Sequence, residues 1–180
     1  MRCVTGLAVS VALSALGAEP EFPPGTPLRP AKTVELVRDD GKTTVTIDFP
    51  ARPGVVEDLV NLIPGETVYL EAQVKGDQLV GLKPVEKVAH PEHTLELDFK
   101  QERSMNPPAM ILKVKNPFKR DLVYEAGIQP EGRQDFFKTS TVPVPAGLQS
   151  YESWPHAITR VLLRDFRLQD AKTEKKPAKP

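Results

Sequence analysis

Apolar and polar residues alternate strictly in five separate runs of this sequence, and this alternation constrains the fold more than any other feature. The runs are 43–49, 66–74, 93–100, 109–115 and 121–128. In 93–100, for example, Leu95, Leu97 and Phe99 fall on one face and charged residues fall on the other. Since successive side chains of a β-strand point to opposite faces, a period of two predicts strands with one buried and one solvated face. The runs therefore predict an antiparallel, all-β protein.

Turn-forming residues separate these runs and support the same fold class. Asp40-Gly41 suits the positive φ values of a tight hairpin turn. A short helix is expected only at 55–62, and the 19 prolines argue against a helical bundle, because an interior proline removes a helix hydrogen bond. Further strands are expected at 33–38, 78–88, 137–144, 147–153 and 158–168, the last with a bulge. We predict a β-sandwich of about seven to nine strands.

The first 18 residues have the layout of a secretory signal peptide. Arg2 precedes an uncharged, mostly apolar run from Val4 to Leu16, and the small residues Gly17 and Ala18 follow. A positive start, a short apolar run and a small-residue cleavage site are marks of export. Cleavage after Gly17 and cleavage after Ala18 both remain open. Because the run is shorter than the ~20 residues that a membrane-spanning helix needs, we expect no transmembrane span in the mature chain.

Removal of the signal peptide would also remove Cys3, the only cysteine. The mature chain would then hold no disulfide and no thiolate metal ligand. No Asn-x-Ser/Thr sequon is present. We expect the protein in a bacterial periplasm, with secretion outside the cell as the alternative.

Composition divides the chain into four parts. We predict a signal peptide at 1–18, a proline-rich extended segment at 19–31, a β-sandwich domain at 32–169 and a disordered, lysine- and proline-rich tail at 170–180. The core would lie entirely in the third part.

The sequence carries no recognisable catalytic motif. It lacks a nucleophile elbow, a glycine-rich phosphate loop, a zinc-binding His-Glu-x-x-His and a calcium loop. Acidic residues mostly occupy outward strand positions, where a solvated sheet face is their ordinary role; a hydrolase with two convergent acidic residues stays an alternative. The equal numbers of acidic and basic residues argue against a nucleic-acid partner. We predict a non-enzyme with no catalytic residue and no cofactor.

His90 and His93, separated by Pro-Glu, form the only close pair of potential metal ligands. Imidazole suits copper and zinc, and Met105 or Met110 would add a thioether for cuprous ion. A periplasmic copper- or zinc-binding protein is therefore an alternative. Polar residues in an exposed turn before a strand are the other interpretation of the same pair.

The segment 149–156 holds the only tryptophan, and we take Tyr151, Trp154 and His156 as candidate binding residues. Aromatic residues with polar neighbours are typical of contact surfaces, and this cluster would stack on a sugar or hold a peptide. The alternative is that Trp154 fills the core between two sheets, as tryptophan commonly does in sandwiches.

Residues 110–126 resemble the strand–turn–strand pattern of bacterial immunoglobulin-like domains, in which an apolar strand ends at an asparagine, here Asn116, and the next strand begins with Leu-x-Tyr. Together with 151–156, this pattern makes 66–168 similar to small uncharacterised exported proteins of Gram-negative bacteria. The resemblance implies an immunoglobulin-like sandwich in the cell envelope. It supplies no catalytic residue, and the chain lacks the cysteine pair of antibody domains.

The function that these features favour is binding. We predict an exported, non-catalytic β-sandwich that binds or supports another envelope component, either a protein or a glycan, through open sheet edges and the aromatic segment. We expect a monomer. The metal-binding protein and the hydrolase stay as alternatives.

Overall fold

A computed structural model describes residues 22–23 and 25–170; the predicted signal peptide at 1–18 and the tail from 171 onward lie outside these residues. Fourteen strands and no helix form in the described residues, which confirms the all-β prediction and exceeds the expected number of strands. The strands are β1 (Leu28–Arg29), β2 (Lys32–Val37), β3 (Thr44–Phe49), β4 (Arg52–Pro53), β5 (Val55–Val56), β6 (Leu59–Leu62), β7 (Glu66–Lys75), β8 (Gln78–Val85), β9 (Thr94–Glu102), β10 (Ala109–Lys115), β11 (Asp121–Pro130), β12 (Phe137–Thr139), β13 (Gln149–Trp154) and β14 (Ile158–Gln169).

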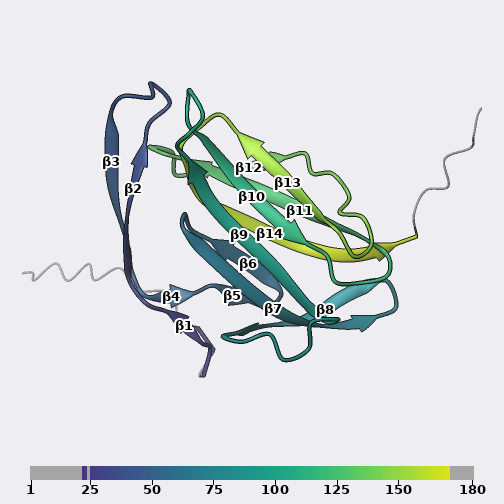
Figure 1. The fold of residues 1–180 in the computed structure, drawn as a ribbon. Coiled ribbons are helices and arrows are strands. Elements are labelled where there is room, and N and C mark those ends of the chain that lie inside the picture. Colours follow the sequence, from purple (N-terminus) through teal and green to yellow (C-terminus); the bar gives the residue numbers. More distant parts are fainter. Residues whose placement is uncertain (1–21, 24, 171–180) are drawn as a thin grey trace, which may run out of the picture.

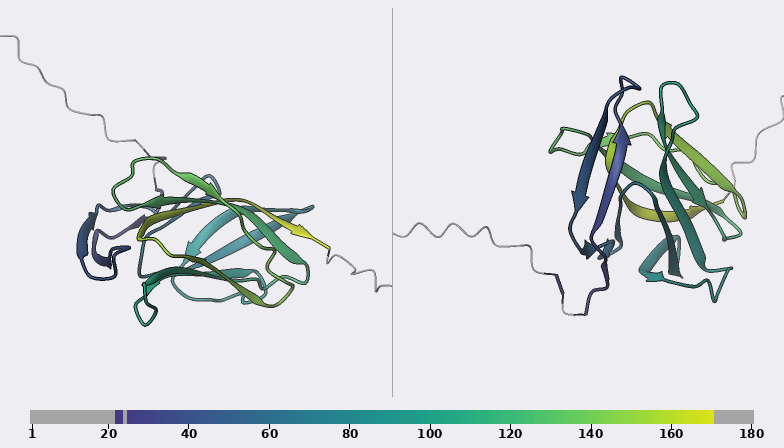
Figure 2. Two further views of the ribbon diagram at one scale, coloured as in Figure 1. Left: turned by 90° about the horizontal axis from the view of Figure 1, so that it is seen from above. Right: turned by 60° about the vertical axis from the view of Figure 1, so that its left-hand side comes forward.

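One large antiparallel sheet contains ten of these strands. Eight follow one another in the order β12-β11-β14-β8-β7-β9-β10-β13, while β6 also pairs with β14, and β5 pairs with β6. The sheet curls, so that β9 and β10 lie across from β11 and β14 (Figures 1 and 2). The β2–β3 hairpin forms a separate two-stranded sheet at one side, and β1, which falls within the predicted proline-rich segment, pairs with β4.

A single cluster of apolar side chains fills the space inside the curled sheet. Leu95, Leu97 and Phe99 of β9 are completely buried, as the alternation predicts, and they belong to the same cluster as Val161 and Leu163 of β14. Full burial of such side chains contributes about 1.5–3 kcal/mol each. The contacts between opposite parts of the sheet hold it in its curled form.

The prediction of a short helix at 55–62 is wrong. This segment forms β5 and β6, joined by a tight turn in which Glu57 and Asp58 have φ values of 48° and 64°. Two positive φ values in succession match the twist of a two-residue hairpin. The strand form also lets Val60 and Leu62 pair with β14 and face the core, where both are completely buried.

All the predicted strands form, and most of them differ from the prediction only in where they begin or end. The predicted bulge in 158–168 is present: Asp165 has a φ of 54°, and the β11–β14 register shifts between Val123 and Glu125. The strand expected at 137–144 is shorter, because only Phe137–Thr139 pairs with β11 before the chain leaves the sheet, apart from one bridge between Val144 and Leu122.

Asp40 and Gly41 form the turn of the β2–β3 hairpin, as predicted. Gly41 has a φ of 66°, and the Asp40 carboxylate accepts hydrogen bonds from the backbone N–H groups of Lys42 and Thr43, both at 2.8 Å. The Thr43 hydroxyl donates a third bond at 2.7 Å. The two backbone N–H groups, followed by this hydroxyl, lower the pKa of Asp40 from 3.8 to about 2. The ionised carboxylate therefore stabilises the turn.

We expect the stabilisation of the fold by the Asp40 carboxylate to disappear in acid. Because its pKa is lower in the folded than in the unfolded protein, its contribution is complete above the ordinary carboxyl range and is lost as the pH falls through 3.8 towards 2. The difference in free energy of unfolding between wild type and Asp40→Ala should shrink over that interval. Glu86→Ala is the control, since the exposed Glu86 side chain makes no hydrogen bond or ion pair in the described part of the chain. An NMR titration midpoint of Asp40 near 3.8 would contradict the prediction.

Candidate functional site

A cavity of about 680 Å³ opens between β8, β14 and the β5–β6 turn. It arises because β14 changes partners: residues 161–163 pair with β6, and only Arg167 pairs with β8, opposite Gln78. Between these two pairings, neither β6 nor β8 is in register with β14. Leu79 and Phe166, both almost completely buried, line this gap from the core side. A volume in the range of about 300–1,000 Å³ is typical of ligand sites.

The backbone around this cavity adopts an uncommon conformation. Glu57, Asp58 and Asp165 are the three non-glycine residues with positive φ among the described residues, and all three line the cavity. Such conformations cost roughly 1–3 kcal/mol each and tend to cluster at functional sites. Asp58 is held in place because its carboxylate accepts a hydrogen bond from the Leu82 N–H at 2.7 Å. The wall of the cavity is thus preformed.

Charged side chains surround the cavity, and only some of them are paired. The Lys138 ammonium and the Arg164 guanidinium each lie 2.9 Å from Glu125 and hold the pKa of this carboxyl below its usual range. A general acid needs a raised pKa, so Glu125 does not suit the general-acid role in the hydrolase alternative. Glu57 and Arg167 have side chains that make no hydrogen bond or ion pair with residues that the structure describes. These two groups are available to a ligand.

A second cavity of about 290 Å³ adjoins the first and shares Leu59, Glu125 and Arg164 with it. Apart from the shared residues and Lys138, its lining is apolar: Ala126, Gly127, Phe136 and Leu162. Leu59 and Phe136 remain 36% and 38% exposed although they are large apolar residues. We call the two adjoining cavities the β14 groove, which has a charged half next to β8 and an apolar half next to β12.

The structure does not bring Tyr151, Trp154 and His156 together on one surface. Trp154 is only 8% exposed; its ring meets Phe99 edge-on at 6.5 Å, and its Nε1 donates to the Thr139 hydroxyl at 3.1 Å. This buried position agrees with the alternative in which Trp154 fills the core. Tyr151 is 57% exposed on the other face of β13, and His156 lies beyond the strand with its Nδ1 2.8 Å from Asp39 Oδ2. A binding role for these residues stays a prediction.

His90 and His93 both line a pocket of about 200 Å³ beside β7 and β8, together with Glu71 and Lys83. They lie in the turn before β9, where the His93 N–H donates to the His90 carbonyl at 3.0 Å. Within the described ranges, no group of three His, Cys, Asp or Glu residues is arranged to hold a metal ion. The two histidines therefore share a pocket, but no third residue of these types is placed to complete a metal site. Metal binding stays a prediction.

Sequence reasoning did not find the β14 groove. Its charged half is assembled from 57–59, 78–80 and 164–167, together with Glu125. The available signal was weak: two acidic residues between apolar pairs at 55–60, which suit a tight turn as well as a helix, and a charged pair at the expected bulge of 158–168. Neither signal shows that these segments meet.

Comparison with known proteins does not assign the chain to a family. No family model matches the sequence, and neither a curated protein nor a solved structure shows significant similarity to the chain. The resemblance to exported immunoglobulin-like proteins accordingly stays a prediction. In the part of the chain that the structure describes, no helix is long and apolar enough to cross a membrane.

Proposed function

We propose that the protein is an exported, non-catalytic binding module of the periplasm, with an immunoglobulin-like β-sandwich fold, which holds an extended segment of another envelope protein in the β14 groove. The observation that carries the proposal is the direct continuity of a charged and an apolar cavity along β14 through Leu59, Glu125 and Arg164. The signal-peptide-like layout of residues 1–18 supports export, and the apolar core enclosed by the curled sheet supports the sandwich fold.

A peptide fits this groove better than a glycan does. Between residues 163 and 167, the edge of β14 opposite β11 is in register with neither β6 nor β8, and backbone groups at such an edge can pair with an added strand. The apolar half, with the part-exposed Leu59 and Phe136, is suited to receive an apolar side chain of the added segment. A short extended segment would use both kinds of contact at once.

Charge indicates which segment the groove selects. The larger cavity is lined by four carboxylates, Glu57, Asp58, Glu125 and Asp165, and by two guanidinium groups, Arg164 and Arg167. This acidic excess favours a partner with a basic side chain, because complementary potentials attract a partner and suppress wrong ones. We therefore specify the occupant as an extended segment that carries an apolar and a basic side chain a few residues apart.

Site-specific crosslinking tests the proposal. A photoreactive residue is placed at Leu59, which lines both cavities, and in a second protein at the exposed Lys87, and each full-length protein is expressed in the native envelope. We expect one partner to crosslink at position 59 but not at 87, and mass spectrometry to place the crosslink in an extended segment with a basic residue. Equal crosslinking at both positions would overturn the proposal.

The affinities of the Arg167→Glu and Leu59→Ser variants for the identified segment test the two halves of the groove. We expect Leu59→Ser to weaken binding by about tenfold, since it removes an apolar contact without adding charge. Arg167→Glu increases the acidic excess and should strengthen binding of the basic segment. Lys119→Glu, an exposed site in the β10–β11 turn, is the matched control and should change nothing. Equal affinities of all the variants would contradict the role of the groove.

A further inference from the structure

The β2–β3 hairpin forms a two-stranded sheet of its own, so each of its strands has one edge that faces away from the other strand. In the turn, the Arg38 N–H donates to the Thr43 carbonyl at 2.8 Å, and along an antiparallel ladder hydrogen-bonded and non-hydrogen-bonded pairs alternate. The observed register therefore directs the backbone groups of every second residue out of the hairpin. These residues are Thr33, Glu35 and Val37 on β2, and Thr44, Thr46 and Asp48 on β3.

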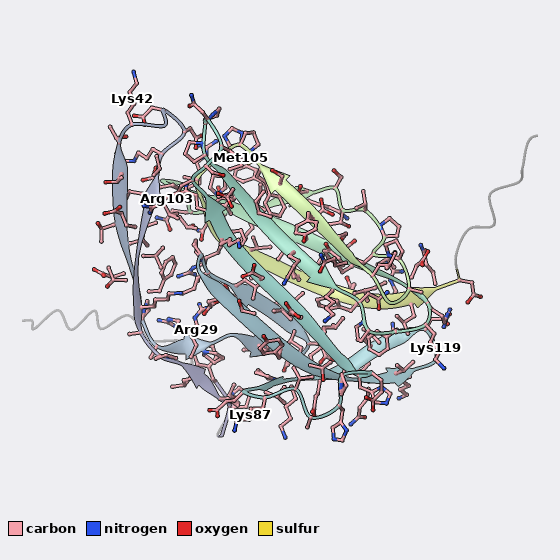
Figure 3. The ribbon with its side chains drawn as sticks, in the orientation of Figure 1. Arg29, Lys42, Lys87, Arg103, Met105 and Lys119 are labelled. Atoms are coloured by element: carbon pink, nitrogen blue, oxygen red, sulfur yellow. The ribbon has the colours of Figure 1, made fainter. Side chains whose placement is uncertain are left out.

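Side chains from β9 cover part of the outer edge of β2. The Gln101 amide pairs with both backbone groups of Val37: its Oε1 accepts from the N–H at 2.9 Å, and its Nε2 donates to the carbonyl at 2.7 Å. Arg103, which Figure 3 shows beside β2, donates from Nη2 to the Glu35 carbonyl at 2.7 Å. These bonds occupy the backbone groups that another strand would need, so the second half of β2 is blocked.

The outer edge of β3 has no such cover. Within the described residues, the outward N–H and C=O groups of Thr44, Thr46 and Asp48 have no hydrogen-bond partner. All three residues are exposed, and β3 lies on the outer side of the hairpin (Figure 1). The strand contains no proline and no lysine, and its pairing with β2 has no bulge. A regular, open edge of this kind is a template for pairing with another chain.

The sequence around β3 is complementary to itself in the antiparallel direction. When two copies of 42–48 are aligned antiparallel about Val45, Thr44 of one copy lies opposite Thr46 of the other. At each end of this alignment, Lys42 of one copy lies opposite Asp48 of the other. Threonine pairs and pairs of opposite charge stabilise cross-strand positions. A second copy of this chain therefore offers the open edge both backbone groups and matching side chains.

Both charged side chains are available for this contact. Lys42 extends from the tip of the hairpin (Figure 3) and makes no ion pair within the part of the chain that the structure describes. Asp48 accepts from the Thr33 hydroxyl at 2.6 Å through Oδ1 and has no cationic partner among the same residues. An alignment about Thr46 would instead place Lys42 opposite Pro50, which has neither a charge nor an N–H. Charge therefore selects the first alignment.

We propose that two copies of this chain associate through their β3 strands, which pair antiparallel about Val45 and join the two hairpins into one four-stranded sheet. Thr44 of each copy exchanges backbone hydrogen bonds with Thr46 of the other. Because the same surface serves on both copies, the interface is closed and association stops at a dimer. This dimer replaces the monomer expected from the sequence. The inference does not rest on the β14 groove, since no residue of β2 or β3 lines either of its cavities.

The oligomeric state tests the inference. The complete sequence is expressed, and the purified protein is sedimented over about 1 µM to 1 mM, because a short strand interface is small and a weak dimer is expected. We expect a reversible dimer, and hydrogen exchange followed by NMR should show the amides of Thr44, Thr46 and Asp48 gaining protection as the dimer fraction rises. The Glu35 amide, on the other edge of the hairpin, should stay unprotected. A monomer at every concentration would overturn the inference.

Two proline variants form a matched pair. Thr46→Pro removes an outward N–H from the interface of each copy, and we expect it to weaken the dimer by about tenfold or more. Glu35→Pro is the control, since Glu35 is the cross-strand partner of Thr46 and its N–H also points outward, but on the β2 side. Both variants keep the hydrogen bonds between β2 and β3, so only Thr46→Pro should change the dimer. Equal dissociation constants for the two variants would contradict the proposed edge.

Exchange of charges identifies the second copy as the partner. Lys42→Asp and Asp48→Lys each create two like-charge pairs in their own dimers, so each should weaken self-association by about tenfold. A mixture of the two variants restores both opposite-charge pairs, and heterodimers of wild-type affinity are expected. Lys119→Asp, an exposed site outside the hairpin, should leave the dimer unchanged. If Asp48→Lys does not fold, Lys42→Asp and the proline pair still decide. Wild-type self-association of both charge variants would overturn the alignment about Val45.

Discussion

Replacement of Asn116 by alanine is expected to lower the free energy of unfolding by about 3 kcal/mol or more. Asn116 is 1% exposed and lies just after β10. Its Nδ2 donates to the carbonyl oxygens of Arg120, Val144 and Pro145 at 2.8–3.2 Å, and its Oδ1 accepts from the Phe118 N–H at 2.9 Å. One side chain therefore ties the β10–β11 turn to the segment between β12 and β13. Alanine would remove the partner of the Arg120 carbonyl and of the Phe118 N–H, while the Val144 and Pro145 carbonyls would keep only the bonds from the Leu122 and Leu148 N–H groups.

The Asn116→Asp variant separates hydrogen bonding from side-chain volume. Aspartate can still accept from Phe118, but its ionised form presents negative charge to three carbonyl oxygens. Its pKa should be raised in the folded state, so its stability should be highest in acid and should fall as the pH rises above about 4. Chemical denaturation at several pH values checks this, with Lys119→Ala as the exposed control. A loss below about 1 kcal/mol in Asn116→Ala would show that water replaces the lost bonds.

The second large effect is expected at Trp154. Truncation to alanine should cost about 3–5 kcal/mol, the range for a large buried aromatic residue, because Trp154 is 8% exposed and packs edge-on against Phe99. Trp154→Phe keeps most of the ring volume but not the hydrogen bond to Thr139, so a smaller loss is expected. The melting temperature and denaturant midpoint measure both changes.

Tyr151→Ala is the matched control for Trp154, since Tyr151 lies on the same strand but is 57% exposed. We expect a loss within about 0.5 kcal/mol, as for most surface substitutions. Because Trp154 is the only tryptophan, its fluorescence reports this site alone. A wild-type emission maximum typical of solvent-exposed tryptophan, or an unchanged melting temperature in Trp154→Ala, would contradict core packing.

Local alternation was enough to predict most strands, because the two-residue period follows from backbone geometry alone. The run 109–115, for instance, coincides with β10 (Ala109–Lys115). The segment 55–62 shows the limit of this reasoning. Its strand form depends on pairing with Val161–Leu163, about a hundred residues later, and no local pattern carries that information.

The candidate site was less predictable than the fold for the same reason. The β14 groove exists because the register of β14 places Asp165 and Arg167 beside Gln78 and the β5–β6 turn. Each segment by itself is an ordinary polar turn or bulge. The placement of the aromatic segment, by contrast, was predictable from the two-residue period of a strand. Tyr151 and Trp154 are three residues apart, so within one strand their side chains point to opposite faces of the sheet. If 149–154 is a strand, Tyr151 and Trp154 therefore cannot belong to one binding surface.

The position of β14 at the end of the described chain has a consequence for how the protein matures. β14 pairs with β11, β6 and β8, so it joins parts of the sheet that are made much earlier. Until residues 158–169 have emerged from the ribosome, the apolar faces of β6 and β11 lack their neighbour and cannot close a core. Contacts of such long range form slowly. The core therefore cannot close before β14 is in place, and we expect the docking of this strand to be a late and slow step of folding.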